Sequence, residues 1–201
     1  MGEVIAEGDD THLKSAVRLV ATLNLVYFGV EFGLARAIGS VSLFADSIDF
    51  LEDASINFLI LVALGWSLAR RARVGMALAV ILLIPSLATL WAALQKLSVP
   101  VPPQPIPLTL TGAGALIVNL VCALLLVRYR RHPGSLTRAA FLSARNDVFA
   151  NIAIIGAGLI TVPLRSAWPD LVVGLGIAVV NGDAAKQVYT AAREERRSVR
   201  P

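Results

Sequence analysis

Two stretches of the chain contain no charged residue, and each is long enough to cross a membrane. They cover residues 74–94 and 106–127. About 20 apolar residues in a helix span the roughly 30 Å of hydrocarbon in a bilayer. With 56% hydrophobic and 16% charged residues, the chain is too apolar for a soluble domain. We therefore expect an integral membrane protein built from helices.

Four further apolar segments carry a few charges each, at residues 19–38, 41–69, 136–161 and 168–188. The predicted fold is all-α, a polytopic membrane protein with six transmembrane helices. A connector with five prolines, residues 98–107, separates two halves of three helices, because dense proline cannot continue a helix. We expect a short tail at residues 1–12, a transmembrane domain at 13–188 and a basic tail at 189–201.

Basic residues predict the orientation of these helices. They precede the first predicted helix and follow the second, fourth and sixth, whereas the opposite loops hold only Arg36, Lys96 and Arg165. By the positive-inside rule we expect both termini to be cytoplasmic. We expect the protein to lie in the cell (inner) membrane. This topology accounts for the net charge of +4, so nucleic-acid binding is not expected.

The helix predicted at residues 41–69 places acids inside an apolar segment. At 100° per residue, Asp46, Asp49, Asp53 and Asn57 lie within an arc of about 80°, while Glu52 points about 100° away from Asp53. Ionisable groups at membrane depth are costly and usually line a cavity or a pathway. We interpret this face as a cation site; the alternative is a set of salt bridges that only fix helix packing.

A related pattern occurs in the helix predicted at residues 136–161. Asp53 and Asn57 have the same spacing as Asp147 and Asn151, and Ser143 takes the position that corresponds to Asp49. The two helices run in opposite directions under the predicted topology. The halves therefore form a candidate inverted repeat, from which transporters often build a site at the membrane midplane.

On these motifs the chain resembles the transmembrane domain of the cation diffusion facilitator (cation efflux) family, six-helix exporters that couple divalent metals to protons. The pattern of that family reads here as Gly39-Ser40, Ala45-Asp46, Asp49 and Asp53. The resemblance implies that Asp49, Asp53 and Asp147 are metal ligands, and it implies a homodimer. The chain resembles the shorter members of that family, which lack the C-terminal cytoplasmic domain, because residues 189–201 are too few to form it.

Ser143 departs from the family pattern, which has a histidine or an aspartate at that position. The polar groups left to assist the three aspartates are Asp46, Ser143, Asn146, Asn151 and Asn57. Oxygen ligands suit hard ions such as Mn²⁺, whereas zinc prefers some imidazole or thiolate. The expected cargo is a divalent cation (Zn, Cd, Co, Fe or Mn), with no permanently bound cofactor.

Three other charges lie inside predicted spans. Glu31, on the same helix face as Asn24, is a candidate proton carrier or gate, or the partner of an arginine. Arg145 points about 200° from Asp147, to the opposite side of its helix. An arginine at membrane depth needs a partner, and the candidates are Glu52 and Glu31. That contact is either a structural ion pair or a gating charge that competes with the cation.

Crowded carboxyl groups predict the mechanism. Three acids at low dielectric cannot all stay ionised, so without metal some hold protons, and a divalent cation displaces them. We expect exchange of metal for protons by alternating access, with efflux implied by the resemblance. One alternative is a non-transporting membrane partner or scaffold with a degenerate metal site. An intramembrane enzyme with paired aspartates is the other, but no nucleophile motif accompanies them, so an enzyme is not expected.

Overall fold

The computed structural model describes residues 2–63, 87–127 and 135–180, with side chains described from residue 13 in the first helix and from residue 147 in the last long one. The four long helices are α1 (Gly2–Ile38), α2 (Val41–Ala63), α4 (Pro105–Val127) and α5 (Ser135–Leu164). Two shorter helices cover residues 87–98 and 168–180. The described residues hold six helices and no strand, which confirms the predicted all-α class.

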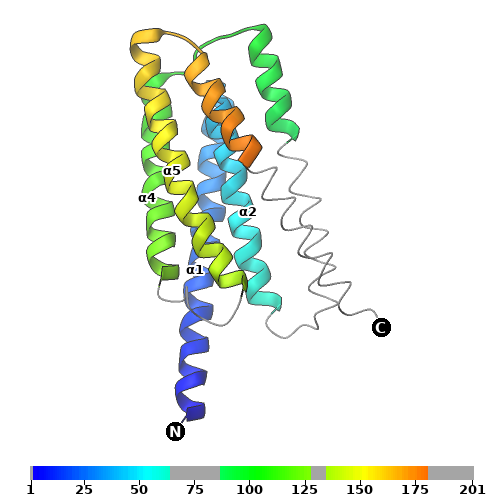
Figure 1. The fold of residues 1–201 in the computed structure, drawn as a ribbon, viewed down its shortest axis with the longest axis vertical. Coiled ribbons are helices and arrows are strands. Elements are labelled where there is room, and N and C mark those ends of the chain that lie inside the picture. Colours follow the sequence, from blue (N-terminus) through cyan, green and yellow to red (C-terminus); the bar gives the residue numbers. More distant parts are fainter. Residues whose placement is uncertain (1, 64–86, 128–134, 181–201) are drawn as a thin grey trace, which may run out of the picture.

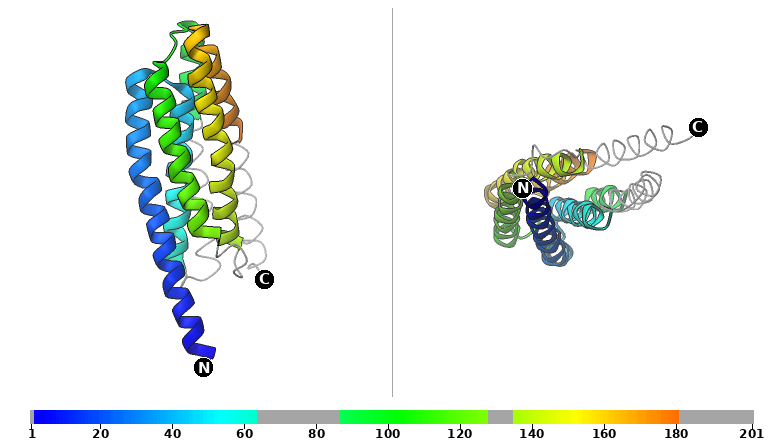
Figure 2. Two further views of the ribbon diagram at one scale, coloured as in Figure 1. Left: turned by 90° about the vertical axis from the view of Figure 1, so that its left-hand side faces the viewer. Right: turned by 90° about the horizontal axis from the view of Figure 1, so that it is seen from below.

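The four long helices form a ring in which α1 packs on α2 and α4, and α5 packs on α4 and α2 (Figures 1 and 2). Three described helical segments are long and apolar enough to cross a membrane: Leu13–Ile38, Pro105–Val127 and Asp147–Leu164. Tyr27 joins two of these helices, because its hydroxyl donates to the carbonyl oxygen of Thr111 on α4 at 2.6 Å. Gly114 leaves room for that ring, since a Cβ there would clash with the Tyr27 hydroxyl oxygen.

The start of α1 corrects the sequence prediction. The helix begins at Gly2, not at residue 19, so residues predicted as a tail are helical. Leu13 and Val17 are buried and pack with Cys122 of α4, while Lys14 and Arg18 on the same turns are exposed. These turns bury one apolar face and keep their charges outside, which extends the helix beyond its uniformly apolar part.

The helices predicted at 19–38 and 41–69 leave two residues between them, and the structure confirms this short turn between α1 and α2. Gly39 has φ of 65°, a left-handed conformation that ends α1, and the amide of Ser40 donates to the carbonyl of Ala35 at 3.0 Å. The Ser40 hydroxyl then accepts from the amide of Leu43 at 3.1 Å, so Ser40 caps the N-terminus of α2. We call this end of the bundle, where residues 99–104 and 165–167 also lie, the Gly39 end (Figure 1).

Other helix bounds agree with the predictions to within a few residues. α4 starts at Pro105, one residue early, and the helix that ends at residue 98 was predicted to end at 94. α5 continues to Leu164 with Pro163 in its last turn, where a missing amide hydrogen removes only one bond. The remaining parts of the predicted helices, at 64–69, 74–86 and 181–188, lie outside the described residues.

Candidate cation site

Asp49 of α2 and Asp147 of α5 line one cavity of about 560 Å³. Both side chains are half-buried. The rest of the described wall is apolar and comes from α5 and the helix at 168–180: Phe149, Ala150, Ala153, Val172, Val173, Gly176, Ile177 and Val180. Two carboxyl groups therefore face one space whose other described lining residues carry no charge.

Asp53 lies one turn further along α2 and is buried, with 3% of its surface exposed. Its carboxyl group lies beside that of Asp147. The structure thus brings together the three aspartates predicted as ligands, with Asp147 next to both others.

The three aspartates do not form a ready coordination sphere. Among the described residues, no three His, Cys, Asp or Glu side chains lie close enough together to hold one metal ion. Within this part of the chain, a bound cation would need either a movement of α2 against α5 or additional oxygen ligands such as amides and water.

Asn57 and Asn151 have the same hydrogen-bond geometry. Each Nδ2 donates to the backbone carbonyl of the aspartate four residues earlier, Asp53 and Asp147, at 2.8 Å in both cases. These bonds fix which amide atom is the oxygen, and each Oδ1 is buried without a hydrogen-bond partner in the described structure. The matching contacts support the predicted correspondence between Asp53–Asn57 and Asp147–Asn151.

Glu31 and Asp46 form a second pair of acids, nearer the Gly39 end. Their carboxyl groups lie beside each other and are fully buried. None of the four oxygens receives a hydrogen from a donor group in the described residues, so the arginine partner considered for Glu31 is not found there. Asn24 is also fully buried, so it and Glu31, which share a helix face, both face the bundle interior.

Glu52 is buried, with 8% exposed. The side chains of Ser143, Arg145 and Asn146 lie outside the described part of the chain, although their backbone belongs to α5. The predicted ion pair between Arg145 and Glu52, and any contribution of Ser143 or Asn146 to the site, therefore remain predictions.

Asp170, in the first turn of the helix at 168–180, was missed by the sequence analysis. It is fully buried and bonds to Lys96, at 2.8 Å, and to the start of α2. One signal was available: Lys96 is among the few basic residues of the loops on this side, and a lone acid near the same predicted membrane surface is a natural partner for it.

Comparison with known proteins agrees with this arrangement. The family model of the cation efflux transmembrane domain matches residues 17–189. A comparison with curated proteins found no match. Since the matched part covers most of the 201 residues, the protein belongs to the cation efflux family and is a metal cation transporter of the membrane.

Proposed function

We propose that the protein exchanges a divalent metal cation for protons by alternating access, in the direction of efflux. The observation that carries this proposal is the placement of Asp49 and Asp147, from two different helices, on one cavity. Two acids in a wall whose other described residues are apolar attract a cation strongly, because apolar surroundings screen their charge less than water does.

Proton exchange is supported by the contact between Asp53 and Asp147. Two carboxyl groups this close together at low dielectric cannot both stay ionised, so one of them holds a proton when no metal is bound. A divalent cation between the two groups would replace that proton, since metal ligation needs the ionised carboxylate. When the site opens to the other side of the membrane, protons return and release the metal.

The chemistry of the available donors supports an oxygen-liganded ion. We propose Asp49, Asp53 and Asp147 as ligands, with the amide oxygens of Asn57 and Asn151 nearby as further acceptors. No histidine or cysteine is among the described residues that line the cavity. Zn²⁺ prefers sites that include imidazole or thiolate, whereas carboxylate and amide oxygens suit Mn²⁺. A site with only oxygen ligands therefore shifts the preference toward Mn²⁺.

The proposal is tested by metal flux into proteoliposomes under an imposed pH gradient, with Zn²⁺, Cd²⁺, Co²⁺, Fe²⁺ and Mn²⁺ compared. We expect flux that depends on the gradient and that falls at least about tenfold in Asp53→Asn, because this change removes a negative charge from the site. Asp9→Asn is the matched control, since this carboxyl group precedes the apolar part of α1. A folded protein that moves none of these ions would contradict the proposal and favour the partner or scaffold function.

A further inference from the structure

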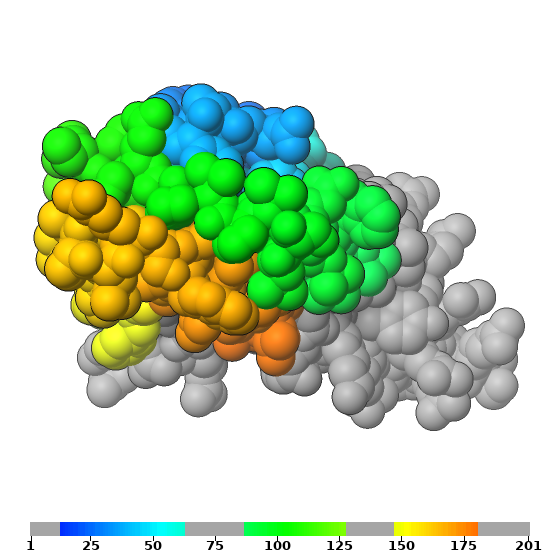
Figure 3. All heavy atoms as spheres, turned by 90° about the horizontal axis from the view of Figure 1, so that it is seen from above, coloured from blue at the N-terminus to red at the C-terminus, as the bar shows by residue number. Residues whose placement is uncertain are grey.

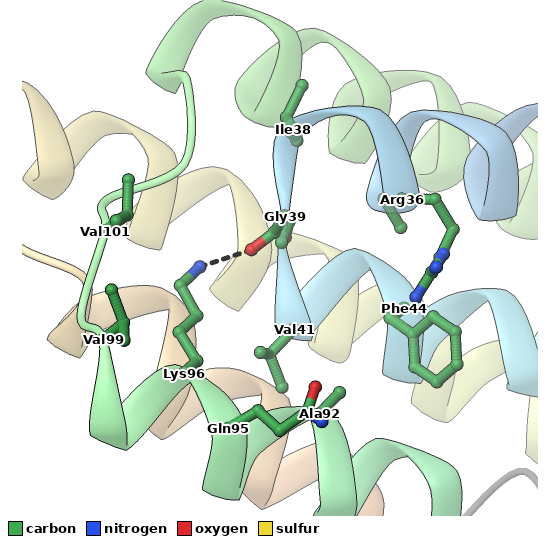
Figure 4. Close-up of a pocket in the computed structure, with 12 residues that line it drawn as sticks. Arg36, Ile38, Gly39, Val41, Phe44, Ala92, Gln95, Lys96, Val99 and Val101 are labelled. Atoms are coloured by element: carbon green, nitrogen blue, oxygen red, sulfur yellow. Dashed lines mark hydrogen bonds between the residues drawn. The ribbon is translucent and has the colours of Figure 1, made fainter.

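Asp170 connects three separate helices at the Gly39 end. Its carboxylate accepts hydrogen bonds from the following donors: Ser40 Oγ (2.6 Å), Val41 N (2.9 Å), Ser42 N (3.1 Å), Ser42 Oγ (2.7 Å) and Lys96 Nζ (2.8 Å). The Lys96 ammonium also donates to the carbonyl of Gly39, at 2.5 Å (Figure 4). One buried acid therefore holds the start of α2 and the end of the helix at 87–98 against the helix at 168–180. We call this set the Asp170 clamp.

Packing around the clamp joins the same three helices. Val41, Ala93, Ala167 and Leu171 form one buried apolar cluster. Gly174 lies directly on the backbone of α2, because a Cβ there would be 2.8 Å from the amide nitrogen of Ser42. Figure 3 views the molecule from this end, where blue, green and orange segments lie side by side on the surface.

The clamp is adjacent to the candidate cation site. Val172 and Val173, in the turn that follows Asp170, already line the cavity, and Gly176 and Val180 continue its wall. α2 carries Asp49 only two turns beyond the amides of Val41 and Ser42. Asp170 thus sets the distance between the wall of the cavity and the helix that carries the aspartates.

A clamp of this kind is costly to open. Asp170 has no exposed surface, and its charge is balanced by Lys96 and by two backbone amides that have no partner within α2. Separating them would leave a buried charge and unpaired donors in an apolar environment. A contact that opened in every transport cycle would add this cost to each cycle.

We propose that the Asp170 clamp is a fixed pivot: the three helices stay joined at the Gly39 end while their other ends move to change access to the cavity. Asp170 is a positioning residue that acts through the helix at 168–180, not a metal ligand. The role of the pivot rests on the proposed transport function, but whether the three helices stay joined can be tested without measuring transport.

The first test measures hydrogen exchange of single amides by NMR on the full chain in detergent. We expect the amides of Val41 and Ser42 to exchange at least about tenfold more slowly than that of Ile106, which also lies in the first turn of a helix at the Gly39 end. Lys96→Met should abolish this protection, because the Asp170 charge loses its counterion. Arg165→Met is the matched control and should preserve it, since Arg165 forms no ion pair with the described residues. Equal exchange at the three amides of the unmodified protein would overturn the pivot.

The second test asks whether a covalent link can replace the clamp. In a Cys122→Ala background, the double variant Ser42→Cys with Asp170→Cys should lose at least about tenfold of the metal flux when reduced, and a short thiol-specific cross-linker should restore most of it. Flux that is unaffected by the two substitutions, or that stays lost after linking, would overturn the pivot. An unmodified protein with slow exchange at Val41 and Ser42 but no flux for any ion would contradict the proposed function alone.

Discussion

At the scale of single residues, Asn57 and Asn151 carry buried polar groups that are costly for stability, and we propose that they assist the cation site. Each carries a buried Oδ1 without a hydrogen-bond partner in the described structure. An unpaired buried acceptor costs about 1–3 kcal/mol. Asn151→Leu should therefore leave the melting temperature unchanged or raise it, while metal flux falls about tenfold because a cation loses an oxygen acceptor next to Asp147.

Asn119 offers the control for this prediction. It is buried on α4 with an unpaired Oδ1 of its own, but it lies outside the pattern shared by α2 and α5. Asn119→Leu should change stability in the same direction and leave flux within about twofold of the unmodified protein. Equal losses of flux in both leucine variants would mean that the pattern on α2 and α5 has no special role.

At the scale of helices, Gly174 determines how closely the helix at 168–180 packs on α2. A methyl group there would meet the amide nitrogen of Ser42 and the carbonyl carbon of Val41, both at 2.8 Å. These are backbone atoms at a capped helix start and cannot move aside cheaply. Gly174→Ala should lower the free energy of unfolding by about 1–3 kcal/mol, measured by thermal or denaturant unfolding in detergent.

Gly176 is the matched control, because it lies half a turn further on the same helix and a Cβ there would have no atom within 4 Å. Alanine is the better helix former, so Gly176→Ala should be neutral or stabilising by up to about 1 kcal/mol. If the two substitutions had the same effect, close packing at Gly174 would not explain the arrangement of these helices.

At the scale of the whole molecule, the four long helices form a ring, and the cavity lies between α5, α2 and the helix at 168–180. Ala153 of α5 is part of the cavity wall. Ala153→Phe would fill part of this space, and we expect metal flux to fall at least about tenfold with little loss of thermal stability, since the added ring enters an open cavity.

Ile152, the neighbouring residue, is 53% exposed and does not line the cavity. Ile152→Phe enlarges a side chain on the outside of α5, so flux should stay within about twofold of the unmodified protein. A drop in flux for Ile152→Phe but not for Ala153→Phe would place the route to the aspartates elsewhere.

Much of the fold could be predicted from the sequence, because a bilayer restricts a chain to few solutions. Uniformly apolar stretches predicted helices, and Gly39-Ser40 predicted the turn into α2. The predicted start of α1 was wrong, because the turns that carry Leu13 and Val17 bury only one face and are not apolar throughout. Asp49 and Asp53 could be chosen because acids in apolar helices are rare and these two share one face of α2, and Asp147 because it precedes Asn151 by four residues, as Asp53 precedes Asn57.

What the sequence by itself determined was therefore the all-α membrane class, the turn at Gly39 and the identity of the acids near the cavity. Only the tertiary structure decided which of them meet: Asp147 with Asp53, Glu31 with Asp46, and Asp170 with Lys96. Periodicity along one helix fixes the direction of a side chain relative to its own axis. It does not fix the rotation of that helix against its neighbours, and this rotation depends on packing between helices, such as the contact of Gly174 with Ser42.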